Sequence, residues 1–179
     1  TIMSQPPQPP PPNAGVRVSC RVRPALISES TRCCTEITRN ACGDLVLQLN
    51  DPKGQHGSDL FTFDGLYTAA SSQGDVFGSE VSHLVGFSLA GMSCSVLSYG
   101  TSGSGKTHTL LGKPEKPSDA GMAPRAASLL LERGAEVSVS LLDISHDSRT
   151  AYDLLSGGAS LAVRENNDGT ARVEGGARV

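Results

Sequence analysis

The amino-acid sequence predicts an α/β fold with a glycine-rich loop that follows a strand and opens a helix. Segments with alternating apolar and polar residues indicate strands, and segments with apolar residues three and four positions apart indicate helices. The two kinds of segment take turns along the 179 residues, which is typical of layered α/β proteins. A chain of this length is expected to form one domain with one core.

The composition is that of a globular protein with few large apolar side chains. It has no Trp, three Tyr and four Phe against 20 Gly and 11 Pro, so we expect modest stability. The formal net charge of −3 lacks the basic excess of a nucleic-acid-binding protein, and no nucleic-acid partner is expected. No apolar run approaches the length of about eighteen residues that indicates a membrane span, so we expect a cytoplasmic protein without membrane association. Five cysteines without C-x-x-C spacing indicate free thiols.

Residues 1–14 are expected to be a proline-rich, disordered linker, and residues 15–179 are expected to form the domain. Proline lacks the backbone N–H and its ring fixes φ, so the tract "SQPPQPPPP" does not form a helix or a central strand. Pro6–Pro12 is a candidate docking site for a proline-binding module. The alternative is a stiff linker without a partner.

The first part of the domain is expected to contain strands followed by a helix. Alternating patterns predict strands in "VRVSCRV" (16–22), "DLVLQLN" (44–50) and "LFTFDG" (60–65). A helix is expected over 72–90, where one face carries Phe77, Val81, Leu84, Val85 and Leu89. Gly91 is expected to cap that helix.

The second part continues the alternation. The expected elements are a strand in "SCSVLSYG" (93–100), a helix opened by "KTHTLL" and ended by Gly112, Pro114 and Pro117, a helix over 124–133, a strand in "VSVSLLDI" (137–144), a short helix around 152–155, and the fragments "LAVRE" and "ARVEG". No internal repeat is visible.

The stretch "SYGTSGSGKTHTLLG" (98–112) has the pattern of a phosphate-binding loop. Gly100, Gly103 and Gly105 permit positive φ, so that successive N–H groups can turn inward towards phosphate oxygens. Lys106 supplies a cation for the terminal phosphates, and Thr107 supplies a hydroxyl ligand for Mg²⁺. The helix that begins there directs its positive end at the anion. The predicted phosphate-binding residues are Gly100, Thr101, Ser102, Gly103, Ser104, Gly105, Lys106 and Thr107.

Taken together, these segments resemble the kinesin motor domain, and the matches are collinear from about residue 15 to residue 176. "VRVSCRVRP" resembles its first core strand with the R-x-R-P signature, and "FTFDGLY…SSQGDVF" resembles the F-x-F-D…V-F-x-Q stretch. The loop resembles Y-G-Q-T-G-S-G-K-T-H-T-M-x-G, and "AGMAPRAASLL" resembles G-I-I-P-R-A-L-x-x-L-F. "VSVSLLDISHDSRTAYDLL" resembles V-x-V-S-Y-L-E-I-Y-N-E-x-I-x-D-L-L, and "LAVRENNDGTARVEGG" resembles L-x-I-R-E-D-x-x-G-x-V-x-V-E-G-L.

The resemblance implies a P-loop NTPase fold with a three-layer arrangement, a sheet with helices on both faces. It also implies ATP or ADP with Mg²⁺ as cofactors, microtubules as partner, and a place on the cytoskeleton. By position, Arg21, Arg23 and Pro24 would form the adenine-side wall, because an arginine plane and a proline ring can pack on a base. The alternative is that Arg21 and Arg23 lie on the solvated face of a strand. The motif C-R-V-R-P favours the class with a C-terminal, minus-end-directed motor.

The chain also departs from the family pattern. Thr101 replaces the usual glutamine of the loop, and "DISHDS" lacks the tyrosine of the edge strand. Downstream of the loop there is no N-x-x-S-S-R-S-H and no D-x-x-G-x-E, the two switches that position the attacking water, hold Mg²⁺ and sense the γ-phosphate. We therefore expect an incomplete motor domain, its N-terminal half, that binds Mg-nucleotide with little or no turnover and lacks most of the microtubule-facing surface. The strands that flank the loop-bearing strand are expected to come from the absent half.

Two other functions remain open on sequence alone. The strand "VSVSLLD" ends in Asp143, which a small complete P-loop NTPase or kinase would use to hold Mg²⁺. A non-enzymatic interaction protein would instead use the proline tract and a decayed nucleotide fold. His108, beside the loop, is expected to be structural rather than catalytic.

Overall fold

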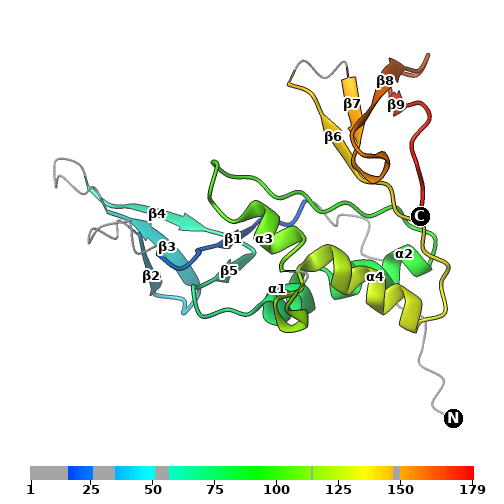
Figure 1. Cartoon of the computed structure of the whole chain (residues 1–179). Helices are drawn as coiled ribbons and strands as arrows, with labels where there is room; N and C mark the ends of the chain where they lie inside the picture. The colour runs from blue at the N-terminus through cyan, green and yellow to red at the C-terminus, as the bar shows by residue number, and fades with distance from the viewer. Residues whose placement is uncertain (1–15, 26–34, 51–56, 114, 147–149) are drawn as a thin grey trace, which may run out of the picture. The chain divides into compact units, whose positions relative to one another are not determined.

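The computed structural model describes residues 16–25, 35–50, 57–113, 115–146 and 150–179 (Figure 1). The expected linker at 1–14, including Pro6–Pro12, lies outside these ranges. The chain divides into two compact units, the first ending at Arg133 and the second spanning Gly134–Val179. Strands and helices are both present, as the α/β class predicts. No helix in the described ranges has the length and apolar character needed to cross a bilayer.

A short parallel pair holds the start of the described chain. Strand β1 (Ser19–Arg21) pairs with β5 (Gly65–Tyr67) in parallel register, with Cys20 opposite Leu66. The strand expected over 16–22 is therefore shorter, although the Val18 N–H donates to the Asp64 carboxylate (2.7 Å) just before it. The pairing with β5 was not expected, because it joins segments far apart in the sequence.

A second sheet follows, with the order β2-β3-β4. Strands β2 (Thr35–Arg39), β3 (Leu45–Leu49) and β4 (Asp59–Thr62) run antiparallel to their neighbours. The expected strand at 44–50 is confirmed, whereas β2 was not expected and Phe63 lies beyond the end of β4. The turn from β2 to β3 is closed by the Asn40 side-chain oxygen, which accepts from the Cys42 and Asp44 N–H groups (3.0 and 2.9 Å).

The helix expected over 72–90 is two helices, α1 (Gln73–Glu80) and α2 (Ser82–Leu89), which are separated at Val81. Ser72 and Asp75 form a capping box at the start of α1, with reciprocal side-chain to backbone hydrogen bonds of 3.1 and 2.8 Å. At the other end, Gly91 has a φ of +89° and donates to the Ser88 carbonyl, as the expected cap requires.

Residues 93–100, expected to be the strand before the glycine-rich loop, form no strand in the structure. Leu97 is 90% exposed and Tyr99 is 96% exposed. A strand requires a hydrogen-bonded neighbour, and among the described residues no segment pairs with this one. The expectation of a strand is wrong for these residues. The described strands form sheets of two, three and four strands.

The loop leads into helix α3 (Lys106–Leu110), which is one turn and a half long. The chain then passes through a 3-10 turn, η1 (Pro117–Asp119), into helix α4 (Met122–Glu132), with Pro124 in its first turn as expected. Helices α1, α2 and α4 contact one another. The buried apolar side chains of the described residues are Val46, Leu47, Val76, Val81, Val85 and Ala151.

The second unit is an antiparallel sheet whose strands follow each other in chain order. It consists of β6 (Leu142–Ile144), β7 (Thr150–Asp153), β8 (Ala159–Glu165) and β9 (Ala171–Val173). The strand expected over 137–144 begins only at Leu142, and Tyr152 lies in a strand rather than in the expected short helix, which is the 3-10 turn η2 (Leu154–Ser156). The buried Asp153 carboxylate accepts from Leu155, Ser156 and the Ala177 N–H, and the Ala177 bond above all lowers its pKa.

Candidate functional site

The glycine-rich loop has the backbone that its glycines predict. Gly100, Gly103 and Gly105 have φ angles of +153°, +76° and +98°, which side chains with a Cβ rarely adopt. Gly105 stands directly before the first residue of α3, and its carbonyl accepts from the Thr109 N–H (2.9 Å). A Cβ on Gly100 would lie 2.6 Å from the Ser104 hydroxyl oxygen. The loop therefore depends on glycine both for its curvature and for space.

Lys106 closes the loop on itself. Its Nζ donates to the carbonyl oxygens of Gly100 and Thr101, each at 2.8 Å. Thr101 takes part through its backbone, so the exchange of glutamine for threonine at this position leaves the contact intact. The ammonium group of the predicted phosphate-binding lysine thus bonds back to the first two residues of the predicted phosphate-binding loop.

Thr107, the predicted Mg²⁺ ligand, is exposed on the first turn of α3. Asp143, the carboxylate of the rival hypothesis, belongs to the second unit, where it lies opposite Tyr152 in the antiparallel pair β6–β7. The aspartate that a P-loop ATPase uses for Mg²⁺ ends a strand of the same sheet as the loop. No group of three or more His, Cys, Asp or Glu side chains suited to a metal occurs among the described residues.

A buried glutamine connects this loop region to the rest of the first unit. Gln73, the first residue of α1, is only 5% exposed. Its amide nitrogen donates to the carbonyl oxygen of His108 in α3 (2.5 Å) and lies 3.4 Å from the Asp119 carbonyl oxygen. Its amide oxygen accepts from Arg21 of β1 (2.7 Å). The Gln73 amide nitrogen also lies 3.3 Å from the His108 Nδ1 atom, so His108 contributes to the structure through its backbone and its ring.

The predicted adenine-side residues have different surroundings. Arg21 is half-buried, and its guanidinium donates to Gln73, to the Thr109 hydroxyl (3.0 Å) and to the Ser71 carbonyl (3.4 Å). Burial lowers its pKa. The alternative of a solvated strand face is therefore wrong for Arg21. Arg23 donates to the carbonyl of Pro24 (2.9 Å), and Pro24 is exposed. A role for these three residues towards adenine stays a prediction.

The letters D-x-x-G-x-E occur once, at Asp75–Glu80, upstream of the loop in α1. Both carboxylates there have structural partners. Asp75 completes the capping box, and hydrogen bonds from Ser72 lower its pKa. Glu80 forms an ion pair with Arg17 (2.8 Å) and accepts from the Tyr67 hydroxyl (2.5 Å). Glu80 therefore joins α1 to β5 and to Arg17, two residues before β1.

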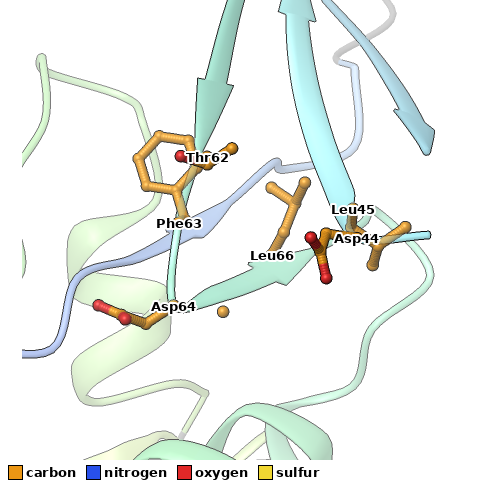
Figure 2. A pocket seen from close by; sticks show the side chains of 7 residues that line it. Asp44, Leu45, Thr62, Phe63, Asp64 and Leu66 are labelled. Carbon is orange, nitrogen blue, oxygen red and sulfur yellow. The ribbon is translucent and has the colours of Figure 1, made fainter. Parts of the chain in front are cut away.

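One hollow of about 360 Å³ lies beside the second sheet. It is lined by Asp44, Leu45, Thr62, Phe63, Asp64, Gly65 and Leu66. Figure 2 shows Asp44 and Asp64 on opposite sides of Leu66, so the two carboxylates do not converge on one point. The Asp64 carboxylate accepts from Val18 and the Asp44 carboxylate from Asn40 (3.2 Å), so both already have protein partners.

Gln73 was not among the residues that the sequence singled out for the site. Its spacing in the sequence indicates it: Gln73 stands three residues before Val76 and four before Phe77, which places it on the buried face of α1. A polar side chain on such a face indicates a hydrogen-bonded role. Its partners come from β1 and α3, far away in the sequence, and periodicity within one helix does not identify them.

Comparison with known proteins identifies the family of this chain. The kinesin motor domain family matches residues 21–179. Protein claret segregational of Drosophila melanogaster is 37% identical over 152 residues, which cover 79% of this chain and 21% of that protein. Kinesin-like protein KIN-14M of Arabidopsis thaliana is 35% identical over 162 residues (85% and 21%), and kinesin-like protein KIF22 of Mus musculus is 33% identical over 179 residues (92% and 26%). This chain therefore spans about a fifth to a quarter of the length of these relatives. The chain belongs to the kinesin motor domain family.

Proposed function

We propose that this chain is the nucleotide-binding part of a kinesin-like microtubule motor. The observation that carries the proposal is the loop, in which three glycines with positive φ lead directly to Lys106 at the start of α3. Such a loop before a helix binds phosphate groups through backbone N–H groups and one lysine. Mg-ATP and Mg-ADP are the proposed ligands, with Gly100–Thr107 around the phosphates and the Thr107 hydroxyl as a ligand of Mg²⁺.

Binding requires an exchange of partners at Lys106. Its ammonium group leaves the carbonyls of Gly100 and Thr101 and takes phosphate oxygens instead. A phosphate oxygen carries more negative charge than a carbonyl oxygen, so the exchange favours the bound state.

We propose little or no ATP turnover by these 179 residues alone. Phosphoryl transfer depends on positioning and on charge stabilisation, and neither family switch follows the loop in this sequence. The described part of the chain offers no alternative carboxylate cluster for a metal. Binding of microtubules, a place on the cytoskeleton in the cytoplasm, and the lean towards a minus-end-directed class are proposals from family membership.

The test is isothermal titration of the purified chain with Mg-ADP and Mg-ATP. We expect binding to the wild type and its loss in Lys106→Ala. The control Lys113→Ala removes an equal charge from an exposed position after α3 and should bind as the wild type does. A folded wild-type chain that binds neither nucleotide would refute the proposal.

Turnover is measured on the same samples by release of phosphate. We expect a rate close to the uncatalysed background. Rapid hydrolysis that Asp143→Ala abolishes would instead support the small complete NTPase.

A further inference from the structure

We propose that Gln73 is a positioning residue of the nucleotide site, which fixes the orientation of Arg21 and of the end of α3 through one buried amide. This inference rests on the proposed nucleotide-binding function. Arg21 and α3 are the two parts of the structure predicted to contact opposite ends of a nucleotide, the base and the phosphates. Gln73 is the residue whose side chain bonds to both.

On the phosphate side, Gln73 completes the hydrogen bonding of a very short helix. Helix α3 spans only Lys106–Leu110, and the last carbonyls of a helix have no N–H donor within the helix. The Gly112 N–H bonds to the Thr107 carbonyl (3.2 Å) rather than to that of His108. The Gln73 amide supplies the donor that His108 lacks, at 2.5 Å. The helix that begins at Lys106 is thereby held from α1.

On the base side, Gln73 holds the side chain of Arg21. The Arg21 Nη1 group donates both to the Gln73 oxygen (2.7 Å) and to the Thr109 hydroxyl (3.0 Å), so strand β1 is joined to α1 and α3 at one point. A guanidinium whose N–H groups are held by acceptors in its plane keeps a fixed plane, and it is through this plane that arginine stacks on a flat ring.

The chemistry of the two contacts requires an amide. The His108 carbonyl only accepts and the Arg21 guanidinium only donates, so the residue between them must donate at one atom and accept at another. These partners also fix which end of the Gln73 amide is nitrogen. Glutamate keeps the acceptor for Arg21 but loses the donor for His108, and methionine keeps the length but loses both.

The experiment compares Gln73→Met and Gln73→Glu with the wild-type chain. Titration calorimetry with Mg-ADP and with Mg-pyrophosphate measures the dissociation constant and the stoichiometry separately. Partial unfolding lowers the measured stoichiometry, because only the folded molecules bind, whereas mispositioned contacts raise the dissociation constant. The matched control is Gln48→Met on β3, because among the described residues the Gln48 side chain donates to the neighbouring Asn50 (2.8 Å), and the same chemical change is made.

We expect Gln73→Met to weaken Mg-ADP binding about tenfold at near wild-type stoichiometry, the effect of one lost hydrogen bond in an oriented site. It should weaken pyrophosphate binding less, because pyrophosphate has no base to contact Arg21. Gln73→Glu should weaken both ligands by a similar factor, because it retains the Arg21 contact. Gln48→Met should leave both constants unchanged.

The inference is overturned if Gln73→Met lowers only stoichiometry or thermal stability and leaves the dissociation constants unchanged. It is also overturned if both Gln73 variants fail to fold, since the residue then supports the fold as a whole. If the folded wild type binds no nucleotide, the proposed function itself fails. The titration of the wild type alone gives this result, so the two failures are distinguished.

Discussion

Gly112 and Gly121 let the chain return against itself after α3. Gly112 has a φ of +75° and forms an isolated antiparallel bridge with Ala120, and the Gly121 N–H donates to the Leu111 carbonyl (3.1 Å). A Cβ on Gly112 would overlap the Asp119 carbonyl oxygen and the Gly121 nitrogen. This crossing places Asp119 next to Gln73, so the two glycines also shape the surroundings of the site.

Gly112→Ala is predicted to destabilise the first unit by more than the left-handed backbone alone explains. The backbone strain costs about 1 kcal/mol, and the overlap with neighbouring backbone adds to it. Gly91→Ala is the matched control, since Gly91 has a φ of +89° but no atom within 4 Å of the added Cβ. Urea denaturation measures both, and equal losses for the two variants would contradict the predicted clash.

Single residues of the loop were predictable, whereas their long-range partners were not. The positive φ of Gly100, Gly103 and Gly105 follows from a local pattern, and the structure confirms it. The hydrogen bonds of Arg21 and Gln73 join β1, α1 and α3. Local periodicity carries no information on which distant segments meet, so these contacts appear only in the folded structure.

At the scale of elements, the helices were predicted better than the strands, which need distant partners. The helical face of residues 72–90 and the cap at Gly91 are present, although Val81 interrupts the helix. The alternating pattern of residues 93–100 indicates a strand with one apolar face. A strand also needs an adjacent strand that forms hydrogen bonds with its backbone. In the described part of the chain that neighbour is absent, and the apolar side chains remain exposed.

Leu97→Ser is predicted to leave the stability of this chain within about 0.5 kcal/mol of wild type and to reduce self-association. Leu97 is 90% exposed, so its replacement removes apolar surface without opening a cavity. Val85→Ser, at a site only 5% exposed in α2, should by contrast cost about 2 kcal/mol or more. Urea denaturation and light scattering measure the two effects. Comparable destabilisation by both variants would show that Leu97 is buried in solution.

At the scale of the whole molecule, carboxylates with lowered pKa values make stability depend on pH. Burial raises the pKa of Glu80, but hydrogen bonds from Arg17, Tyr67 and Ser19 outweigh it and leave the pKa below its usual value. Accepted hydrogen bonds also lower the pKa of Asp75, Asp119, Asp153 and Asp168. A carboxyl group whose pKa is lower in the folded chain stabilises the fold at any pH above its pKa in the unfolded chain, which is near 4. This stability is lost as the pH falls through the pKa of the group in the folded chain.

The free energy of unfolding is therefore predicted to fall as the pH decreases from about 5 to about 3. Glu80→Gln should lower stability at pH 7, because it removes the ion pair with Arg17, and should make the decline towards low pH shallower. Urea denaturation at a series of pH values gives both slopes. Parallel curves for wild type and variant would mean that Glu80 does not contribute to the acid sensitivity.

The chain-order arrangement of β6, β7, β8 and β9 has a kinetic consequence. Each strand bonds to the one synthesised just before it, so every pairing closes a short loop, and hairpins of this kind form in about 1–10 μs. The parallel strands β1 and β5 are instead separated in the sequence by the whole of the β2-β3-β4 sheet, so their pairing closes a longer loop at a larger entropic cost. The sheet of the second unit, Gly134–Val179, is therefore expected to form faster than the β1–β5 pair.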